Sequence, residues 1–240
     1  MLDRNNPIPL HEQLLNILED EIENGKWGPN EKIPSENELS SHYGISRMTV
    51  RSVLTDLVRE GWLYRVQGKG TFVSDKIEAL SPSYIGIREQ LEQMGYQVTT
   101  KIIYCREEAC SSTVAKRLHL NPGDSVCKIK RVRYTKNGPI SIHISYINSK
   151  YSSVLTESLL EREQLCVILN NEYGLQRKKV VETLESVSAS EEEAKLLEIQ
   201  KEYPLLLLRD VIFSQDGKPF EYTKVIFRGD KIKIRLVYEA

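Results

Sequence analysis

Two arginines one helical turn apart, Arg47 and Arg51, are the residues whose spacing first indicates chemistry. At about 100° per residue they lie along one flank of a helix, and Met48, Ser52 and Thr55 complete its exposed face. A guanidinium on the first turns of a helix can donate two hydrogen bonds to guanine O6 and N7 in the major groove of DNA. The pair therefore favours duplex DNA as a partner over a merely solvated charged face, provided that the neighbouring elements form a DNA-binding module.

The residues around this pair predict the elements that hold it. Ser35 and Glu38 read S-x-x-E, a capping box that begins a short helix, and Gly44 ends that helix. Ser46 can cap the next helix, which ends at Gly61. The apolar positions of this third helix recur at helical spacing and form one stripe: Val50, Val53, Leu54, Leu57 and Val58.

A first amphipathic helix precedes these two helices, and a hairpin follows them. Apolar residues recur at helical spacing from Leu10 to Ile22, just before Gly25. Beyond the third helix, the strand-like runs WLYRV and TFV flank QGKG, whose glycines supply the positive φ of a tight turn. Three helices and a hairpin within the first 75 residues predict a winged helix-turn-helix domain.

The charge of the chain changes sign where the expected DNA-reading helix begins. The whole chain has a formal net charge of -1, which argues against indiscriminate binding to nucleic acid. Residues 1–44 contain three basic and nine acidic residues, whereas residues 45–76 contain six basic and three acidic ones. This local clustering favours a sequence-specific regulator over an architectural protein that coats DNA.

Residues 33–73 resemble the DNA-binding domain of GntR-family bacterial transcription regulators. The resemblance implies that Arg47 and Arg51 read operator bases and that the hairpin tip, residues 67–69, enters the minor groove. In this family an arginine of the second helix commonly contacts DNA too, but the matching residue here is Asn37, so the operator sequence stays open. The residues expected to contact DNA are Ser35, Asn37, Ser46, Arg47, Thr49, Arg51, Gln67, Gly68 and Lys69.

A turn-prone segment after the hairpin marks a domain boundary. We expect a DNA-binding domain over residues 1–75, a linker over 76–86 and a second domain over 87–240. In the second domain, AKRLHLNPGDSVCKIKRVRYTKNGP and AKLLEIQKEYPLLLLRDVIFSQDGK align at an offset of 79 residues. Each copy reads helix, strand, turn, strand, with Ser112 and Ser190 as helix caps. The domain is therefore expected to be α+β with an antiparallel sheet.

Arg131 and Arg133 share one face of the strand in the first copy, and the aligned face of the second copy carries Asp210. We expect this face to be largely buried, where breaking a charge pair costs roughly 3 to 5 kcal/mol, so both guanidiniums need an anion. That anion is either an internal acid or the phosphate or carboxylate of a ligand, and the spacing alone does not decide between them. The internal candidates are Glu182, Glu185 and Glu221.

Residues 84–240 resemble the effector domain of the HutC subfamily, the UTRA domain, whose fold is similar to chorismate lyase. The resemblance rests on KRVRYTKNGPISIHISYIN, on LNNEYG and on DGKPFEYTKVIFRGD. It implies that Arg131 and Arg133 bind the anionic group of an effector, with assistance from Arg88 and Glu221.

Three residues of this region depart from the subfamily's pattern. His143 stands where relatives usually carry an acid, and Gln164 and Cys166 stand in a segment that many relatives read as S-L-Y. Such changes alter which hydroxyl or amine groups of a ligand the site can satisfy. All three are therefore candidate effector contacts, and a buried core histidine is the alternative for His143.

Other classes of protein find little support in the sequence. MLDRNNPIPLHEQ lacks the apolar core of a signal peptide, and no run reaches the ~18 apolar residues of a membrane span, so we expect a cytoplasmic protein. The four cysteines and four histidines form no metal-ligand motif, and we expect no metal and no cofactor. No nucleophile and base stand at a recognisable spacing, which weighs against a working lyase.

We therefore expect a transcription regulator rather than an enzyme. Because one winged helix reads few base pairs, the regulator is expected to be a homodimer that binds a palindromic double-stranded operator. A small anionic effector, such as a phosphorylated sugar or a sugar-amine derivative, is expected to release it from DNA.

Overall fold

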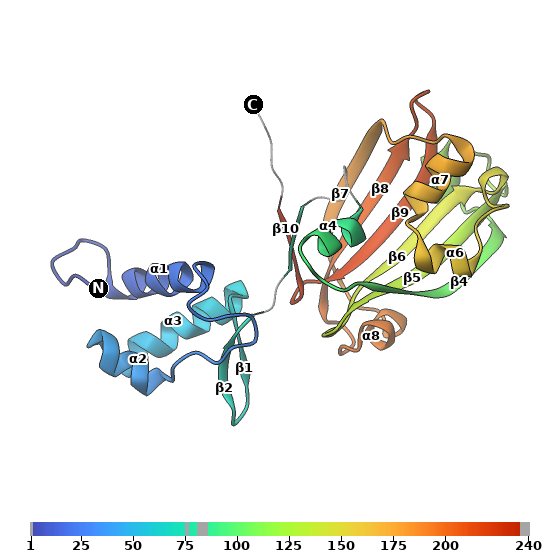
Figure 1. Cartoon of the computed structure of the whole chain (residues 1–240). Helices are drawn as coiled ribbons and strands as arrows, with labels where there is room; N and C mark the ends of the chain where they lie inside the picture. Colours follow the sequence, from blue (N-terminus) through green and yellow to red (C-terminus); the bar gives the residue numbers. More distant parts are fainter. Residues whose placement is uncertain (1, 75–76, 81–85, 236–240) are drawn as a thin grey trace. The chain divides into compact units, whose positions relative to one another are not determined.

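The computed structural model describes residues 2–74, 77–80 and 86–235, and the chain divides into two compact units, residues 1–76 and 77–240 (Figure 1). Each unit has its own apolar core. The described part of the first unit forms, in chain order, α1 (Leu10–Glu23), α2 (Glu36–Tyr43), α3 (Arg47–Glu60), β1 (Leu63–Val66) and β2 (Gly70–Val73). This is the expected order of a winged helix-turn-helix.

Side-chain caps determine where α2 and α3 begin. The Ser35 hydroxyl accepts from the backbone N–H of Glu38, whose carboxylate accepts from the backbone N–H of Ser35 at 2.8 Å, so the predicted capping box is present. Ser46 caps α3 by accepting from a backbone N–H of its first turn at 3.1 Å. Gly44 and Gly61, with φ of 64° and 81°, end the two helices in the left-handed conformation that favours glycine.

The apolar stripe of α3 is the centre of the first core. Val50, Val53, Leu54 and Leu57 are at most 1% exposed, and they share this core with Leu14 and Leu18 of α1. Burying each of these side chains contributes about 1.5 to 3 kcal/mol. Their burial fixes the rotation of α3 about its axis, so the opposite face of the helix is held towards solvent.

The second unit is built on a six-stranded antiparallel sheet with strand order β4-β5-β6-β9-β8-β7. This confirms the α+β class expected from the sequence. The strands are β4 (Thr99–Ala109), β5 (Ser125–Thr135), β6 (Gly138–Asn148), β7 (Lys179–Ser188), β8 (Pro204–Phe213) and β9 (Pro219–Arg228). The helices are α4 (Ile87–Gln93), α5 (Ser112–Leu118), η1 (Ser149–Tyr151), α6 (Glu157–Arg162), α7 (Leu165–Tyr173) and α8 (Glu191–Leu197).

Helices cover both faces of this sheet. Buried residues of α6 and α7 pack with Cys127 and Ile129 of β5, whereas α8 packs with Val132, which points to the opposite face of the same strand. α5 packs on the α8 side, and Leu91 of α4 packs with Val225 on the α7 side. Both faces of β5 are therefore buried, and Arg131 and Arg133, on the face that bears α4, α6 and α7, are 4% and 6% exposed (Figure 1).

The predicted internal repeat is confirmed, because α5-β5-β6 and α8-β8-β9 have the same order and occupy equivalent positions about the β6–β9 pair. Both hairpins turn at a glycine with positive φ, Gly138 at 99° and Gly217 at 77°. Ser190 caps α8 as expected, but α5 is capped by Ser111 and not by Ser112, which is the first residue of the helix. Only the hydroxyl of residue 111 reaches the backbone N–H three residues ahead.

Part of the segment expected to be a linker is a strand. β3 (Ile77–Leu80) pairs in parallel with β10 (Ile232–Arg235), so residues 77–80 belong to the second unit. The remaining expected linker residues 76 and 81–85 lie outside the described part of the chain, whereas Gly86 is described and precedes α4. Within the described residues, no helix is long and apolar enough to cross a membrane.

Candidate nucleic-acid interface and ligand pocket

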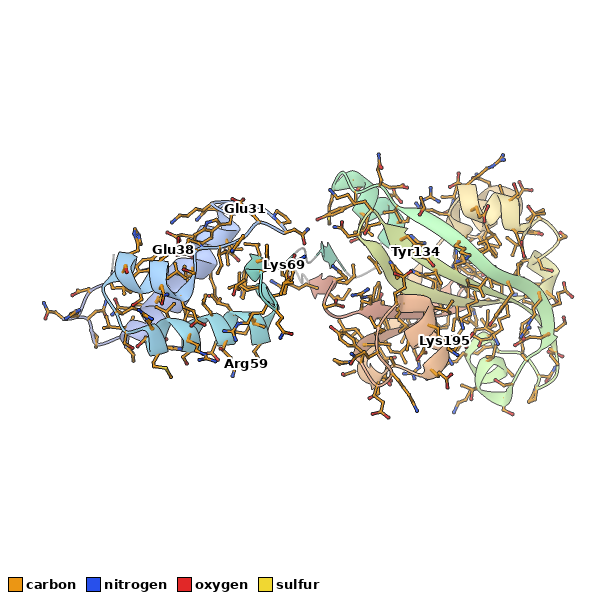
Figure 2. The ribbon with its side chains drawn as sticks, turned by 90° about the horizontal axis from the view of Figure 1, so that it is seen from below. Glu31, Glu38, Arg59, Lys69, Tyr134 and Lys195 are labelled. Atoms are coloured by element: carbon orange, nitrogen blue, oxygen red, sulfur yellow. The ribbon has the colours of Figure 1, made fainter. Side chains whose placement is uncertain are left out.

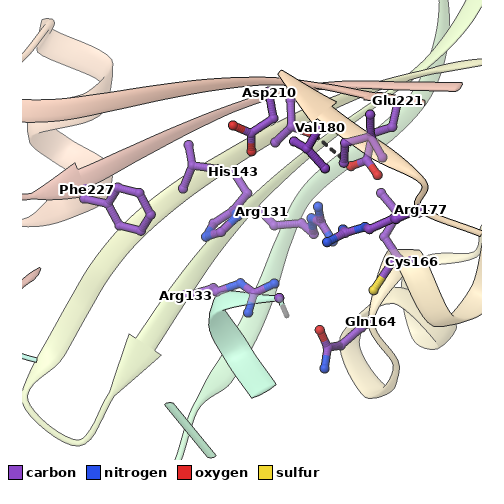
Figure 3. Close-up of a pocket in the computed structure, with 15 residues that line it drawn as sticks. Arg131, Arg133, His143, Gln164, Cys166, Arg177, Val180, Asp210, Glu221 and Phe227 are labelled. Carbon is purple, nitrogen blue, oxygen red and sulfur yellow. Dashed lines mark hydrogen bonds between the residues drawn. The ribbon is translucent and has the colours of Figure 1, made fainter. Parts of the chain in front are cut away.

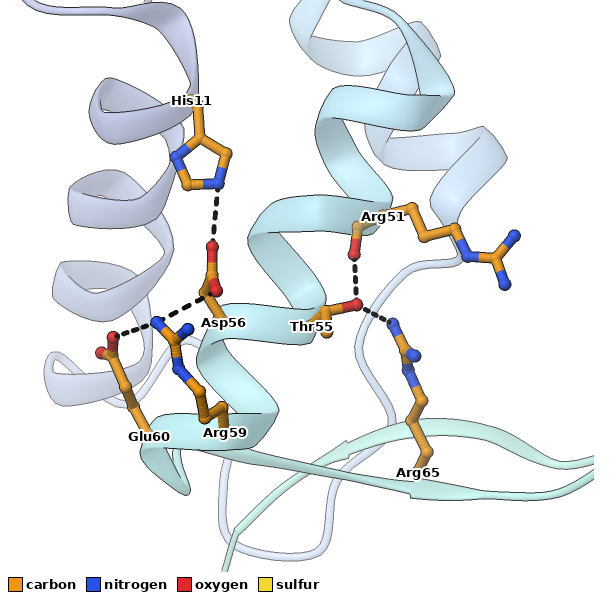
Figure 4. Close-up of polar contacts among 7 residues, drawn as sticks. All are labelled: His11, Arg51, Thr55, Asp56, Arg59, Glu60 and Arg65. Atoms are coloured by element: carbon orange, nitrogen blue, oxygen red, sulfur yellow. Dashed lines mark hydrogen bonds and ion pairs between the residues drawn. The ribbon is translucent and has the colours of Figure 1, made fainter.

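The exposed face of α3 presents two unpaired guanidiniums. Arg47 and Arg51 are both exposed, and among the described residues neither forms an ion pair. Met48 between them is 72% exposed, whereas Val50 on the opposite face is fully buried. The side chain of Arg51 extends away from the helix into solvent (Figure 4). These are the positions predicted from helical spacing, and both side chains are available to a groove of duplex DNA.

A hydrogen-bond chain ties the hairpin to α3 beside Arg51. The Thr55 hydroxyl donates to the Arg51 carbonyl oxygen at 2.7 Å and accepts from Arg65 Nη2 of β1 at 3.0 Å (Figure 4). On the other flank, Asp56 pairs with His11 of α1 at 3.0 Å. No role of Arg65 was predicted from the sequence, because its contact with α3 depends on how the hairpin folds back.

The other residues expected to contact DNA divide into helix caps and hairpin tip. Ser35 and Ser46 are exposed caps, and the Thr49 hydroxyl lies 2.9 Å from that of Ser46. Gln67, Gly68 and Lys69 are exposed in the β1–β2 turn, where Gly68 has a φ of 73°. Lys69 is labelled in Figure 2 at the hairpin of the first unit. A hollow between α2, α3 and the hairpin is lined by residues that include Asn37, Arg51, Arg65, Gln67 and Gly68.

The second unit contains a pocket on the sheet face that bears α4, α6 and α7. β5, β6, β7, β8 and β9 all contribute to it, together with the beginning of α7 (Figure 3). The residues that line it are Gly86, Arg131, Arg133, His143, Gln164, Leu165, Cys166, Arg177, Val180, Asp210, Ile212, Glu221, Thr223, Val225 and Phe227.

Six of the seven residues expected to bind an effector line this pocket, and Arg88 does not. Arg88 instead pairs with Glu92 of its own helix at 2.8 Å and donates to the carbonyl oxygen of Glu161 at 3.1 Å. It remains close enough to Arg133 that its positive charge helps to lower the pKa of that residue. Arg88 therefore lies near Arg133 without lining the pocket.

Arg131 joins a buried polar network across three strands. Its Nη2 donates to the Ser145 hydroxyl at 2.9 Å, and that hydroxyl donates to Glu221 Oε1 at 3.0 Å. Thr223 also donates to Glu221 Oε1, at 2.7 Å. Glu221, one of the three internal acids considered as partners, thus reaches Arg131 through a serine, while Arg131 Nε and Glu221 Oε2 have no hydrogen-bond partner within the described part of the chain.

Arg133 is the least satisfied cation of the pocket. It is 6% exposed, its Nε and Nη1 have no hydrogen-bond partner, and among the described residues it forms no ion pair. Burial, together with the positive charges of Arg131 and Arg88, lowers its pKa to about 9. Glu185 does not neutralise the charge of Arg133, because its carboxylate pairs with Arg209. A buried, unpaired guanidinium in a pocket is a group that an incoming anion would stabilise.

His143 is both buried and part of the pocket. It lies opposite Arg131 in the β5–β6 register, and its Nε2 is 2.9 Å from the Ser141 hydroxyl. Burial and the charges of Arg133 and Arg131 hold the pKa of His143 well below its ordinary value. The imidazole is therefore neutral near pH 7 and adds hydrogen-bonding capacity without adding charge.

The beginning of α7 closes another side of the pocket. Gln164 is the residue before the helix, and Cys166 lies in its first turn, where burial raises the pKa of the thiol. Gly86 lies directly against Gln164, because a Cβ at position 86 would collide with Gln164 Oε1. Glycine at this position therefore allows the amide to approach the backbone that precedes α4.

Arg177 and Asp210 also line the pocket, and no ligand-binding role was predicted for either residue from the sequence. Asp210 is 6% exposed, and burial followed by the charges of Glu182 and Glu221 raises its pKa to about 8. Its alignment with Arg131 in the internal repeat was a usable signal. Arg177 comes from the segment between α7 and β7, for which the sequence carried no such signal.

A winged helix-turn-helix with an exposed arginine pair, followed by a unit with a charged buried pocket, defines a one-component transcription regulator. The model of the gntR family of bacterial regulatory proteins matches residues 10–73, and that of the UTRA domain matches residues 93–233. The chain belongs to the GntR family and has the UTRA domain expected of its HutC subfamily. It is a transcription regulator of the repressor type and not an enzyme.

Relatives and solved structures agree with this assignment. The HTH-type transcriptional repressor NagR of Bacillus subtilis (strain 168) is 34% identical over 232 residues, covering 96% of this chain and 95% of NagR. The histidine utilization repressor of Pseudomonas putida is 29% identical over 95% of this chain and 91% of its own length. The crystal structure of PhnF from Mycobacterium smegmatis has the same fold, with a TM-score of 0.64 and 21% sequence identity. The match covers 96% of this chain and 99% of PhnF.

Proposed function

We propose that this repressor binds a palindromic operator as a homodimer in the cytoplasm and is released from it by a small anionic metabolite of the phosphorylated sugar or sugar-amine class. The observation that carries the proposal is the pair of buried arginines, Arg131 and Arg133, which line a pocket and have guanidinium nitrogens without a hydrogen-bond partner among the described residues. Phosphate and carboxylate oxygens match the planar fork of arginine donors.

The DNA part of the proposal rests on the geometry of the first unit. Arg47 and Arg51 are exposed on α3, and Lys69 is exposed at the hairpin tip beside Gln67 and Gly68. One such unit reads a single half-site, so a two-fold dimer doubles the base contacts and fixes the spacing of two half-sites. The caps Ser35 and Ser46, together with Thr49 of the first turn of α3 and the exposed Asn37, would contribute phosphate or base contacts around this core.

The effector part of the proposal assigns a role to each face of the pocket. Arg131 and Arg133 would hold the anionic group, with Arg88 strengthening the local positive potential. His143, Gln164 and Cys166 would contact the uncharged part of the ligand, since each adds hydrogen-bonding atoms at its edge. A coupling of about 1 to 3 kcal/mol between ligand and operator would change operator affinity roughly 5- to 150-fold.

Fluorescence anisotropy with labelled DNA from upstream of the gene tests this function directly. The protein is titrated at physiological salt with and without a panel of phosphorylated sugars and sugar-amine conjugates, and its mass in solution is measured by light scattering. We expect selective binding by a dimer and reversal by one class of compound. Failure to select any sequence from genomic DNA would refute the regulator, and a ligand that tightened binding would refute release.

Arg133→Ala separates the two halves of the proposal. The variant should bind the operator as the wild type does but should not respond to the effector, because the anion loses its least satisfied cation. Lys195→Ala is a control, since Lys195 is 74% exposed on α8 and does not line the pocket. A variant that folds and still responds fully to the effector would remove Arg133 from the site.

A further inference from the structure

Two cysteine sulfurs are in contact in the second unit, on neighbouring strands of the sheet. Cys105 of β4 and Cys127 of β5 have their Sγ atoms 3.7 Å apart, and both are free cysteines. In the β4–β5 register Cys105 is opposite Ile129 and Cys127 is opposite Glu107, so the two cysteines are diagonal neighbours on one face of the sheet. They are 22 residues apart in the chain, so the pairing of the strands, and not a local motif, brings them together.

The two thiols differ in their access to solvent. Cys105 is partly exposed and donates to the carbonyl oxygen of Leu155 at 3.5 Å, whereas Cys127 is 2% exposed and packs with buried residues of α6 and α7. The hydrogen bond between the two thiols lowers the pKa of Cys105 and, together with burial, raises that of Cys127, so Cys105 ionises first. An oxidant from solvent therefore meets the more nucleophilic sulfur first, and a second thiol is already in contact with that sulfur.

A disulfide between these two cysteines requires β4 to move. Bonded sulfurs lie about 2.0 Å apart with their Cα atoms about 4.4 to 6.8 Å apart, whereas the Cα atoms of diagonal neighbours on antiparallel strands are about 7 to 8 Å apart. β4 can make this adjustment, because it is at the edge of the described sheet and its register with β5 already shifts between Ile102 and Tyr104. The bond would be strained, and strained disulfides are the easily reduced ones that act as switches.

We propose that Cys105 and Cys127 are a site of reversible oxidation, at which a peroxide converts the two thiols into a disulfide that displaces β4 and α6. The helix moves with the strand because α6 packs against β4 and the thiol of Cys105 contacts the segment that leads into α6 (Figure 1). Disulfides of cytosolic proteins are usually transient and redox-sensing. This inference goes beyond the proposed function and does not depend on it.

The reaction consumes one molecule of hydrogen peroxide as the oxidant. The Cys105 thiolate attacks one peroxide oxygen, so an S–O bond forms, the O–O bond breaks, and the departing hydroxide takes up a proton and leaves as water. The Cys127 sulfur then attacks the sulfur of the resulting sulfenic acid, so the S–S bond forms and the S–O bond breaks. The hydroxyl group leaves with the Cys127 proton as a second water. Two thiols thus lose two electrons, and the peroxide gains them.

Thiol counting and mass spectrometry on the full chain test this inference. The reduced protein is treated with an equimolar amount of hydrogen peroxide, and the remaining thiols are alkylated. We expect two of the four cysteines to become inaccessible to the alkylating reagent, and a peptide pair joined through Cys105 and Cys127. Reduced glutathione should restore all four thiols. Hydrogen–deuterium exchange of the β4 and α6 amides should change on oxidation, whereas that of the β8 and β9 amides should not.

Single substitutions assign a role to each sulfur. In Cys105→Ser the three remaining thiols should stay free after the same treatment, because the sulfur that peroxide attacks is gone. In Cys127→Ser the reaction should stop at the sulfenic acid of Cys105, which a cyclic dione reagent labels. Cys166→Ser is the matched control, because it removes the other partly exposed cysteine and should still lose two thiols. Hydrogen–deuterium exchange of the reduced variants checks that each is folded.

The possible outcomes are distinct. Four free thiols in the treated wild type, a bond between any other two cysteines, or a bond between two copies of the chain overturns the inference. A bond that forms but resists glutathione overturns its reversibility. If the bond forms and the exchange of the β4 and α6 amides is unchanged, the proposed displacement is wrong.

Discussion

Replacing Asp210 by asparagine should change how the stability of the second unit depends on pH. Burial, followed by the charges of Glu182 and Glu221, raises the pKa of Asp210 from its ordinary 3.8 to about 8. In the unfolded chain this carboxyl ionises near pH 4, whereas in the folded protein it keeps its proton until about pH 8. The wild type therefore loses stability as the pH rises between these values, because the native state binds the extra proton.

The size of the stability difference between Asp210→Asn and the wild type follows from the difference between the folded and unfolded pKa values of Asp210. At about 1.4 kcal/mol per pKa unit, the rise from 3.8 to about 8 corresponds to roughly 6 kcal/mol. Relaxation around the ionised carboxylate reduces this cost, so we expect Asp210→Asn to be more stable than the wild type by about 2 to 6 kcal/mol above pH 8. Below pH 4 the two proteins should be equally stable, since a protonated carboxyl and an amide are both neutral.

The assay must report on the two units separately. Both tryptophans, Trp27 and Trp62, belong to the first unit, so urea unfolding followed by tryptophan fluorescence should be the same in both proteins at every pH. Hydrogen–deuterium exchange of the β8 and β9 amides reports on the second unit. The other ionisable groups of the pocket, including Arg133, are present in both proteins, so their titration largely cancels in the difference. Parallel stability curves from pH 5 to pH 8.5 would refute the reasoning.

Three further predictions concern the first unit. Arg51→Ala should weaken operator binding by about 1 to 3 kcal/mol and relax base preference. Arg59→Ala, on the other flank of α3, should leave operator affinity unchanged. If anisotropy shows that Arg51→Ala loses equal affinity for operator and scrambled DNA, Arg51 does not read bases. Lys69→Ala should weaken binding to all DNA and lower the slope of log affinity against log salt by about one, and an unchanged slope would contradict a phosphate contact. Ser35→Ala should lower the free energy of unfolding of the first unit by about 0.5 to 2 kcal/mol, measured by urea unfolding. Ser41→Ala is the control, because Ser41 is an exposed residue of the same helix. Equal urea midpoints for the two variants would show that the capping box does not stabilise the unit.

Features specified by neighbouring residues could be predicted from the sequence. The capping box at Ser35, the cap at Ser46 and the glycine turns of the hairpins depend on contacts within a few residues. The buried face of Arg131 and Arg133 follows from the alternation of side chains along one strand. These signals were enough for the winged helix-turn-helix and for the repeated helix, strand, turn, strand order.

Features that depend on packing between distant segments could not be predicted. The pairing of β3 with β10 joins two short segments from opposite ends of the second unit, and no local pattern specifies it. Arg177 enters the pocket from a connecting segment, and the direction of Arg88 is set by its contact with the Glu161 carbonyl oxygen. α5 is capped by Ser111 and not by Ser112. Because the two serines are adjacent, the sequence alone does not show which of them caps the helix.

The internal repeat places Arg131 and Asp210 at aligned positions in the two halves of one sheet, which meet at the β6–β9 pair. If both halves had the same residue there, the pocket would be nearly indifferent to the direction in which a ligand entered it. A guanidinium at one position and a carboxyl group that keeps its proton until about pH 8 at the other remove that indifference. Under the proposed function, a ligand with two chemically different ends would bind in one orientation, so the same chemical group would always face the same half of the domain.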